Sequence, residues 1–259
     1  MIRQKAVGVI PARMGSSRYP GKPLEPILGQ PMLWHTWKRS LLSGALDRVV
    51  IATCDAAIRD AASAFGAEVV MTSDTHVRAG DRVAEAAAGM DAEIVLNIQG
   101  DEPLVHPQLI RDVVAMYDGR PEVLCVNPIA AIEDAGDLTS RNTVKVVCDL
   151  QGRVLYFSRF PIPSDWMSPR NGPVYRQVPI LAFRRQFLLD LASLPEGPLE
   201  QQESVDLLRP LEHGFPIHAL VTPYQTVGVD EPADVPRVEK LLLADPVYAQ
   251  YRDDAGKDR

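Results

Sequence analysis

The sequence predicts an α/β fold built on a doubly wound, mostly parallel sheet. In the N-terminal half, short runs of β-branched residues are apolar along their whole length, and amphipathic stretches of helix length separate them. Strands that helices cover on both faces have this pattern. The expected strands cover residues 6–11, 48–52, 68–71 and 93–98, and the expected helices cover residues 31–43, 56–65 and 82–88. We expect Trp34 and Trp37 to lie on the buried face of the first helix.

A different pattern begins after Ile129. Residues 143–148 and 153–157 predict a β-hairpin, because a short turn containing Gly152 joins them. The Pro-rich residues 160–179, centred on Asn171-Gly172-Pro173, predict a long loop. The remaining expected strands cover residues 180–183, 217–221 and 226–229, and the remaining expected helices cover residues 185–192, 200–213 and 233–243. The tail from Tyr251 is polar, and we expect it to fray.

The composition limits the classes of partner. The chain has 259 residues, 46% of them hydrophobic, and its 27 Lys and Arg against 34 Asp and Glu give a net charge of −7. A surface that binds nucleic acid needs spread positive charge, so we expect none, and any phosphate must be bound locally. Three separated cysteines, Cys54, Cys125 and Cys148, predict buried reduced thiols. The apolar runs are only of strand length, so we expect no membrane contact, no leader segment and a cytoplasmic location.

The segment after the first strand has the chemistry of a phosphate-binding loop. It carries Arg13, Arg18 and Lys22, together with two serines and two glycines, where an open α/β sheet binds its ligands. Glycines let backbone N–H groups approach phosphate oxygens, and the cations neutralise their charge. The segment is neither a G-x-G-x-x-G loop nor a Walker A loop, since Pro23 follows the lysine. A surface loop with solvated cations is the alternative.

Two carboxylates follow apolar runs elsewhere in the chain. Asp101 comes directly after the run at residues 93–98, and Asp230 follows residues 226–229. A magnesium ion bound with substrate phosphates takes one or two protein carboxylates, and the ends of strands can supply them. The alternatives are helix caps, formed by Glu102 in a turn and by Asp230 before Pro232. Together with the cationic loop, the two aspartates predict phosphoryl-type transfer with Mg²⁺.

Five motifs in this order resemble the 3-deoxy-manno-octulosonate (KDO) cytidylyltransferases, or CMP-KDO synthetases. They are V-I-P-A-R-M-G-S-S-R-Y-P-G-K-P-L, N-I-Q-G-D-E-P-L, V-K-V-V, Y-F-S-R-F-P-I-P and V-G-V-D-E-P-A-D-V, and they span nearly the whole chain. The resemblance implies a Rossmann-like sheet of the nucleotide-diphospho-sugar transferase type, with a single domain over residues 1–250 and a polar tail over residues 251–259. It also implies a small inserted β arm at residues 127–180 that makes a homodimer contact.

The resemblance also implies the reaction and its residues. CTP and a small acidic sugar-like acceptor would give a CMP-sugar and pyrophosphate by Mg²⁺-assisted, in-line attack on the α-phosphate. The implied catalytic residues are Arg13, Arg18, Lys22 and Asp101, and the implied metal ligands are Asp101 and Asp230. The expected nucleotide-binding residues are Pro11, Ala12, Arg13, Lys22, Arg78, Ala79, Arg82, Gln99 and Gly100. The expected acceptor-binding residues are Gln99, Gln177, Phe183, Glu203 and Asp206.

The chain departs from the family pattern at three segments. The Ser-Gly-Thr of the H-x-S-G-T-[DE]-R segment is here Arg78-Ala79-Gly80. The histidine and two tyrosines of a second segment are Gln177, Leu181 and Phe183, and the Glu-Gln of a third is Asp206-Leu207. Because buried polar groups matched to substrate hydroxyls set specificity, we expect the chemistry to hold and the acceptor to differ. Arg78 either faces the acid group of the acceptor or is a solvated loop arginine.

Three functional hypotheses therefore stand. The first is a cytidylyltransferase acting on KDO or a related ulosonic acid. The second is a nucleotidyltransferase of the same fold with another nucleotide, or with a smaller acid, a phosphonate or a sugar phosphate as acceptor. The third is a non-catalytic nucleotide-binding homologue, which the retention of Arg13, Lys22, Asp101 and Asp230 disfavours, since such a charged cluster has no structural reason to persist.

Overall fold

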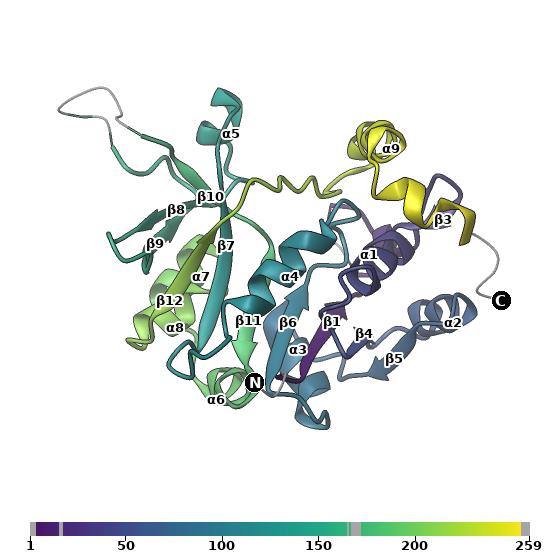
Figure 1. Ribbon diagram of the computed structural model, residues 1–259, viewed down its shortest axis with the longest axis horizontal. Coiled ribbons are helices and arrows are strands. Elements are labelled where there is room, and N and C mark those ends of the chain that lie inside the picture. The colour runs from purple at the N-terminus through teal and green to yellow at the C-terminus, as the bar shows by residue number, and fades with distance from the viewer. Residues whose placement is uncertain (1–3, 16–17, 165, 167–171, 255–259) are drawn as a thin grey trace.

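A central sheet joins both halves of the chain in the computed structural model, which describes residues 4–15, 18–164, 166 and 172–254. Among these residues the strand order is β5-β4-β1-β6-β11-β7-β10-β8-β9, with β12 beside β7 (Figure 1). The first four strands of this order run parallel to one another. They are β1 (Ala6–Pro11), β4 (Arg48–Thr53), β5 (Glu68–Met71) and β6 (Ile94–Ile98). The predicted α/β fold class is confirmed.

Helices cover both faces of the parallel strands, because successive side chains of each strand enter two different cores. Ile10 of β1 packs in one core with α1 (Met32–Leu41), α2 (Ala56–Ala64) and α4 (Pro107–Ala115). Val9 packs in the other core with α3 (Ala79–Ala88) and α6 (Arg185–Ser193). Trp34 and Trp37 of α1 are buried in the first core, as predicted. Figure 1 shows α1 and α4 crossing in front of the central strands.

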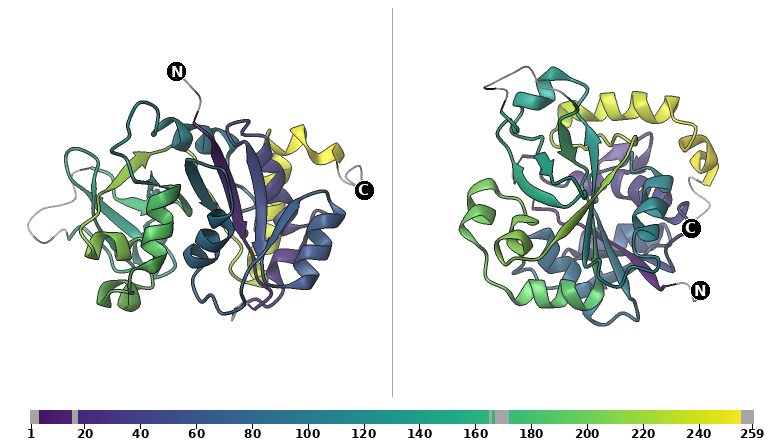
Figure 2. Two further views of the ribbon diagram at one scale, coloured as in Figure 1. Left: turned by 90° about the horizontal axis from the view of Figure 1, so that it is seen from below. Right: turned by 60° about the vertical axis from the view of Figure 1, so that its left-hand side comes forward.

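The strands beyond residue 124 are mostly antiparallel and continue the same sheet (Figure 2). The predicted hairpin is confirmed as an antiparallel pair. Further along, β10 and β11 follow one another along β7, and β11 also pairs with β6. The strands of this region are β7 (Cys125–Ala131), β8 (Lys145–Cys148), β9 (Val154–Ser158), β10 (Tyr175–Gln177), β11 (Ile180–Arg184) and β12 (Ile217–Val221). Through β11, the arm and the parallel strands share one hydrogen-bonded sheet.

Several sequence-based expectations are wrong in this half. Tyr175–Gln177 is a strand inside the predicted loop, whose residues 165 and 167–171 lie outside the described part. The helix predicted at residues 200–213 is two helices, α7 (Pro198–Glu203) and α8 (Leu208–Glu212), because Ser204 takes a left-handed φ of 51° and ends the first. Residues 226–229 form no strand: the Val229 N–H donates to the Asp101 carbonyl at 3.0 Å, but these residues join no ladder within the described part of the chain. The predicted strands also do not include β7.

The smaller elements complete the chain. They are β2 (Pro26–Ile27), β3 (Gln30–Pro31), α5 (Ala135–Thr139), α9 (Val235–Ala244) and the 3₁₀ turns Lys22–Leu24, Pro232–Asp234, Tyr248–Gln250 and Arg252–Asp254. No described helix has the length and apolar character needed to cross a membrane. All three cysteines are unpaired, as predicted, but only Cys125 is buried and the other two are half-buried.

The C-terminal segment is anchored rather than frayed at Tyr251. Its ring is 1% exposed and packs against Trp34 and His35 of α1. The Nε2 atom of His35 lies 2.8 Å from the Ile27 carbonyl oxygen, which can only accept, so Nε2 carries the proton. Nδ1 of His35, 3.2 Å from the Tyr251 hydroxyl, is then the acceptor of that hydroxyl. Residues 255–259 of the predicted tail lie outside the described part.

The buried His35 predicts a loss of stability in acid. Burial lowers the pKa of the His35 imidazole to about 4, below its ordinary value of 6.5. The unfolded chain therefore takes up a proton between pH 6.5 and 4 that the folded chain does not, and the free energy of unfolding falls as the pH drops through this range, by roughly 3 kcal/mol from this residue. Denaturant unfolding at several pH values measures this slope, which should be weaker in His35→Gln. A native imidazole that titrates near pH 6.5 by NMR would contradict the prediction.

Candidate active site

A polar cleft of about 300 Å³ opens at the carboxyl ends of β1 and β6. Its lining comes from the loop after β1, the first turn of α3 with the loop before it, and the segment after β6. The lining residues are Pro11, Ala12, Arg13, Arg18, Lys22, Pro23, His76, Val77, Arg78, Ala79, Arg82, Gln99, Gly100 and Asp101. Every residue predicted to bind the nucleotide is among them, and so are all four predicted catalytic residues. The structure thus brings these residues together, although they come from three separate segments.

The loop after β1 is held by its own backbone and by one carboxylate. The Ala12 N–H donates to the Ala52 carbonyl at 2.9 Å, and the Met14 N–H donates to Oδ2 of Asp55 at 2.8 Å. The loop returns through Gly21, whose φ of 80° suits glycine and whose N–H donates to the Met14 carbonyl at 2.9 Å. Asp55 was missed by sequence reasoning. Its signal was the same as that of Asp101, an acidic residue just after a buried strand. The two predicted loop serines, at positions 16 and 17, lie outside the described residues.

Gly100 allows the ends of β1 and β6 to approach closely. A Cβ atom at Gly100 would lie 3.0 Å from the Pro11 carbonyl oxygen, which belongs to the backbone and cannot move aside easily. The Gly100 carbonyl in turn accepts from the Thr36 hydroxyl of α1 at 3.3 Å. Beside it, the Gln99 amide donates to Oδ1 of Asn97 at 3.1 Å. The floor of the cleft is therefore fixed by backbone packing and by a helix below it.

Two cations that line the cleft, Arg18 and Lys22, pair with both predicted metal ligands; Asp101 also lines the cleft, while Asp230 is not among its lining residues. Nζ of Lys22 donates to Oδ2 of Asp101 at 2.5 Å and to the Val229 carbonyl at 3.0 Å, and it lies 4.0 Å from Oδ1 of Asp230. Nη2 of Arg18 lies 2.8 Å from the same Asp230 oxygen. Lys22 is well buried, with 14% of its side chain exposed, so water screens these charges only partly.

Neither Glu102 nor Asp230 caps a helix, so both of these alternatives are wrong. Asp230 directs its side chain at Arg18, while Glu231 and Asp234 form the capping box of the following turn. The helix that Glu102 was expected to cap is α4, and its cap is His106, whose side chain accepts from the Gln108 N–H. The two aspartates are thus free of capping and face the cations.

Glu102 instead packs behind the two aspartates. Its Oε2 atom is buried without a described hydrogen-bond partner, and a Cβ atom on Gly228 would lie 2.7 Å from Oε1. Burial raises the pKa of the Glu102 carboxyl to about 8, and the neighbouring Asp101 charge adds to this rise. Glu102 therefore fills the space between the segments that carry Asp101 and Asp230, a role that the sequence did not indicate.

The carboxylates of Asp101 and Asp230 fit the coordination of a magnesium ion that is bound together with substrate phosphates. Asp101 and Asp230 both lie within 4.0 Å of one ammonium group, so a cation already occupies the space that they flank. The described residues contain no cluster of three or more His, Cys, Asp or Glu side chains that could hold a metal by themselves. Mg²⁺ bound with substrate phosphates needs only one or two carboxylates, and the other ligands are phosphate oxygens and water.

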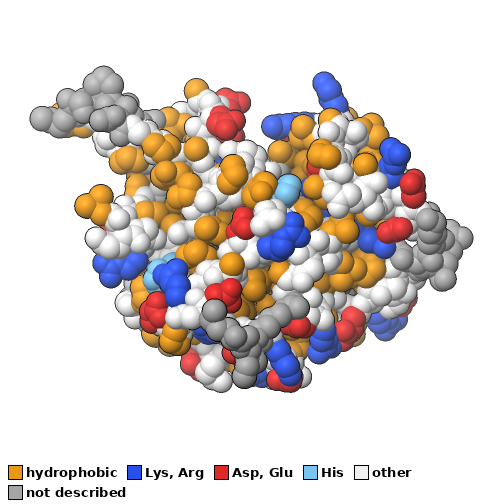
Figure 3. Space-filling view, in the orientation of Figure 1, with side chains coloured by type: hydrophobic (Ala, Val, Ile, Leu, Met, Phe, Trp, Pro, Cys, Tyr) orange, Lys and Arg blue, Asp and Glu red, His pale blue; other side chains and the backbone are white. Residues whose placement is uncertain are grey.

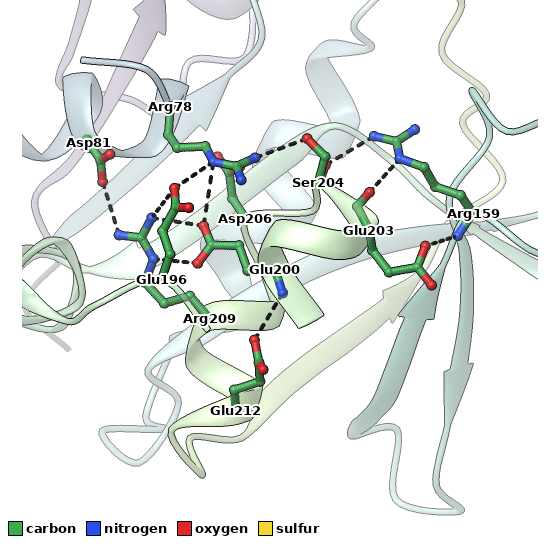
Figure 4. Close-up of polar contacts among 10 residues, drawn as sticks. All are labelled: Arg78, Asp81, Arg159, Glu196, Glu200, Glu203, Ser204, Asp206, Arg209 and Glu212. Atoms are coloured by element: carbon green, nitrogen blue, oxygen red, sulfur yellow. Dashed lines mark hydrogen bonds and ion pairs between the residues drawn. The ribbon is translucent and has the colours of Figure 1, made fainter. Parts of the chain in front are cut away.

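The opposite wall of the cleft carries an ion-pair network (Figure 4). Nε of Arg78 lies 3.0 Å from Glu196, and its Nη1 lies 3.5 Å from Asp206. Arg209 binds the fully buried Glu200 through two hydrogen bonds of 2.8 Å. Only 16% of the Arg78 side chain is exposed, so the reading of Arg78 as a solvated loop arginine is wrong.

Two other cleft residues are held locally. Arg82 is buried, and its Nη1 contacts the Thr72 hydroxyl and donates to the Ser73 carbonyl at 3.2 Å. The His76 imidazole contacts the Glu85 carboxylate, which also accepts from the Ser73 N–H at 3.0 Å. These contacts fix the loop that leads into α3.

The residues expected to bind the acceptor are spread over several places. Gln99 lines the cleft, while Phe183 and Asp206 line a smaller hollow beside it. Gln177 and Glu203 line neither. Glu203 accepts from the Ser158 hydroxyl at 2.9 Å and from a backbone N–H at 2.8 Å, so its carboxylate is already engaged. The acceptor role of these residues stays a prediction.

A cationic loop that faces two carboxylates at the switch point of a doubly wound sheet is the arrangement of an enzyme that binds a nucleotide and transfers a phosphoryl-type group. A family model described as "Cytidylyltransferase" matches residues 7–218. The 3-deoxy-manno-octulosonate cytidylyltransferase of Solibacter usitatus is 43% identical over 241 residues, which are 93% of this chain and 96% of that protein. The protein of the same name from Zea mays is 39% identical over 93% of this chain and 82% of its own length. This chain therefore belongs to the 3-deoxy-manno-octulosonate cytidylyltransferase family.

Solved structures agree with this assignment. The structure of CMP:2-keto-3-deoxy-manno-octonic acid synthetase complexed with CTP superposes with a TM-score of 0.86 at 38% identity, over 93% of this chain and 99% of that one. The 4-diphosphocytidyl-2C-methyl-D-erythritol synthase of Anaerococcus prevotii has a TM-score of 0.61 at 14% identity, over 93% of this chain and 99% of that one, and shares the fold. The family predicted from the motifs is confirmed.

The carboxylate of Asp55 predicts a specific effect on the loop. Asp55→Ala removes the acceptor for the Met14 N–H, so we expect CTP to bind about tenfold more weakly by calorimetry, since a hydrogen bond to a charged group contributes about 1.5–3 kcal/mol. Asp55→Asn keeps an acceptor oxygen and should retain most of the affinity. The control is Asp60→Ala on the exposed side of the same helix, which should bind like wild type. Equal affinity in Asp55→Ala and Asp60→Ala would refute the tether.

Proposed function

We propose that this protein is a CTP-dependent cytidylyltransferase that couples CMP to a sugar acid, KDO or a related ulosonic acid, and releases pyrophosphate. The observation that carries the proposal is that Lys22 and Arg18, which line the cleft, pair with both Asp101 and Asp230. The names of the relatives and the CTP complex among the similar structures support the nucleotide and the acceptor class. A cytoplasmic location stays a prediction.

The chain's own residues account for most of the chemistry. In-line displacement at the α-phosphate moves negative charge onto the pyrophosphate, and Arg13, Arg18 and Lys22, which line the cleft, stabilise that charge. Lys22 and Arg18 exchange their carboxylate partners for phosphate oxygens when the nucleotide enters. Asp101 and Asp230 would then hold Mg²⁺, which supplies Lewis-acid polarisation of the phosphates. The tethered loop and the rigid floor at Gly100 hold the reacting groups in line.

The residues hold the acceptor and the nucleotide in one site without a covalent intermediate. Gln99 lines the same cleft as the cationic loop and the first turn of α3, so it is placed to contact either substrate. Arg78 and Ala79 form the far wall, where the family pattern has a nucleotide-holding segment. Because these two residues depart from that pattern, the choice of nucleotide needs a direct test. A different acceptor or nucleotide remains the second candidate function.

We also propose that the arm of residues 127–180 makes a homodimer contact. Its outer surface carries exposed apolar side chains, among them Leu155 and Phe160, which are 61% and 63% exposed, and Val221 of the adjoining β12 is 61% exposed. Figure 3 shows hydrophobic side chains gathered over the region that β7, β8 and β10 occupy in Figure 1. Apolar surface of this kind favours association with a second copy. The boundaries of the domain and of the arm remain part of this proposal.

A pyrophosphate-release screen tests the function. The protein with Mg²⁺ is offered CTP, UTP, GTP or ATP against sugar acids, phosphonates and sugar phosphates. We expect release with CTP and an ulosonic acid. Release with no pair would refute the transferase proposal, and turnover with UTP or ATP alone would overturn the cytidylyl assignment.

The proposed role of Asp101 can be tested separately. Asp101→Asn keeps the size of the side chain and removes its charge, so we expect a loss of Mg²⁺-dependent turnover of about 100-fold or more, because a metal contributes several kcal/mol to the transition state. Asp118→Asn is the control, since Asp118 is exposed and outside the cleft. Circular dichroism checks that both variants fold. Turnover of Asp101→Asn equal to that of the control would contradict the ligand role.

A further inference from the structure

A small hollow adjoins the cleft on the side away from the cationic loop. The first turn of α3 separates the two spaces: Ala79 lines the cleft, Gly80 lines the hollow, and Arg78 lines both. The hollow has a volume of about 20 Å³, which is room for one water-sized or methyl-sized group. Arg78 is therefore the side chain past which a small substituent of a ligand in the cleft would enter the hollow.

The floor of the hollow is apolar. Leu181 and Phe183 of β11, Leu188 and Leu191 of α6, and Leu207 form it, and each is at most 8% exposed. None of these side chains has a hydroxyl or an amide. A hydroxyl group that entered the hollow would lose its water and meet no partner on this floor, which is costly in free energy.

The polar groups at the rim are already paired with one another. Arg78 lies 3.5 Å from Asp206, and Arg209 lies 3.2 Å from Asp81. Arg209 is further fixed by its two hydrogen bonds to the buried Glu200. The ion pairs therefore hold the rim in place. Because the rim charges are engaged with one another, they do not replace the hydrogen bonds to water that a hydroxyl would lose on the floor.

We propose that this hollow is a specificity pocket for a methyl-sized apolar substituent of the acceptor. The chain then selects a sugar acid in which one side-chain hydroxyl is replaced by hydrogen, so that a methyl or methylene group enters the pocket. This inference rests on the proposed cytidylyl transfer. Phe183 and Leu207 are its specificity-determining residues, and Arg78 forms its entrance. The expected discrimination between the two acceptors is about tenfold or more in kcat/KM, the range that one such group produces in an apolar pocket.

The first experiment compares acceptors with the wild-type enzyme. Pyrophosphate release with CTP is measured for 3-deoxy-manno-octulosonate and for a set of analogues, each lacking one side-chain hydroxyl. We expect at least one deoxy analogue to exceed the parent acid about tenfold or more in kcat/KM. A parent acid that is preferred over every analogue would overturn the pocket, while leaving the proposed function intact. No release with any acceptor would instead count against the proposed function.

The second experiment adds polar groups to the pocket. Phe183→Tyr and Leu207→Gln each give the floor a hydrogen-bonding group, so both should lower kcat/KM for the preferred deoxy analogue and narrow its advantage over the parent, with KM for CTP unchanged. Phe187→Tyr is the matched control, because Phe187 is buried beside Phe183 but does not line the hollow. Denaturant unfolding checks each variant. An unchanged acceptor preference in both folded pocket variants, or an equal change in the control, would refute the proposal.

Discussion

The ammonium group of Lys22 between Asp101 and Asp230 is the interaction on which the site depends. It joins the loop after β1, the segment after β6 and the irregular stretch that ends at Asp230, which are far apart in the chain. Each carboxylate would repel the other without a cation between them, because the side chains are partly withdrawn from water. A chain of net charge −7 thus keeps phosphate-binding cations by pairing them internally, and these pairs connect the segments around the cleft.

Much of this arrangement could be predicted from local sequence. In the parallel half, β-branched runs alternate with amphipathic stretches, and burial on both faces leaves few other structures for such a pattern. Arg13, Lys22 and Asp101 could be predicted because the segments that carry them begin where β1 and β6 end, and a parallel sheet gathers its ligand-binding groups there. The hairpin of β8 and β9 could also be predicted, because its turn and both of its strands are adjacent in sequence.

The features that sequence reasoning missed depend on distant partners. Arg78 reads as a loop arginine until Glu196 and Asp206, more than a hundred residues later, are placed beside it. Tyr175–Gln177 is a strand only because β7 and β8 flank it, whereas residues 226–229 have a strand pattern but join no ladder among the described residues. Tyr251 sits in a polar tail, yet α1 supplies the apolar surface that buries it. In each case tertiary context overrides local preference.

The order of the strands also has a consequence for biosynthesis. β11 inserts beside β6 although more than eighty residues separate them, and Asp230 reaches the cleft later still. During synthesis β1 and β6 can pair only after β6 has emerged, because these two parallel strands are about as far apart in the chain as β6 and β11. The cleft, however, acquires its second carboxylate only when residue 230 has emerged. A chain still being translated therefore lacks this carboxylate for most of its synthesis, and the set of charged groups around Lys22 can be completed only near the end.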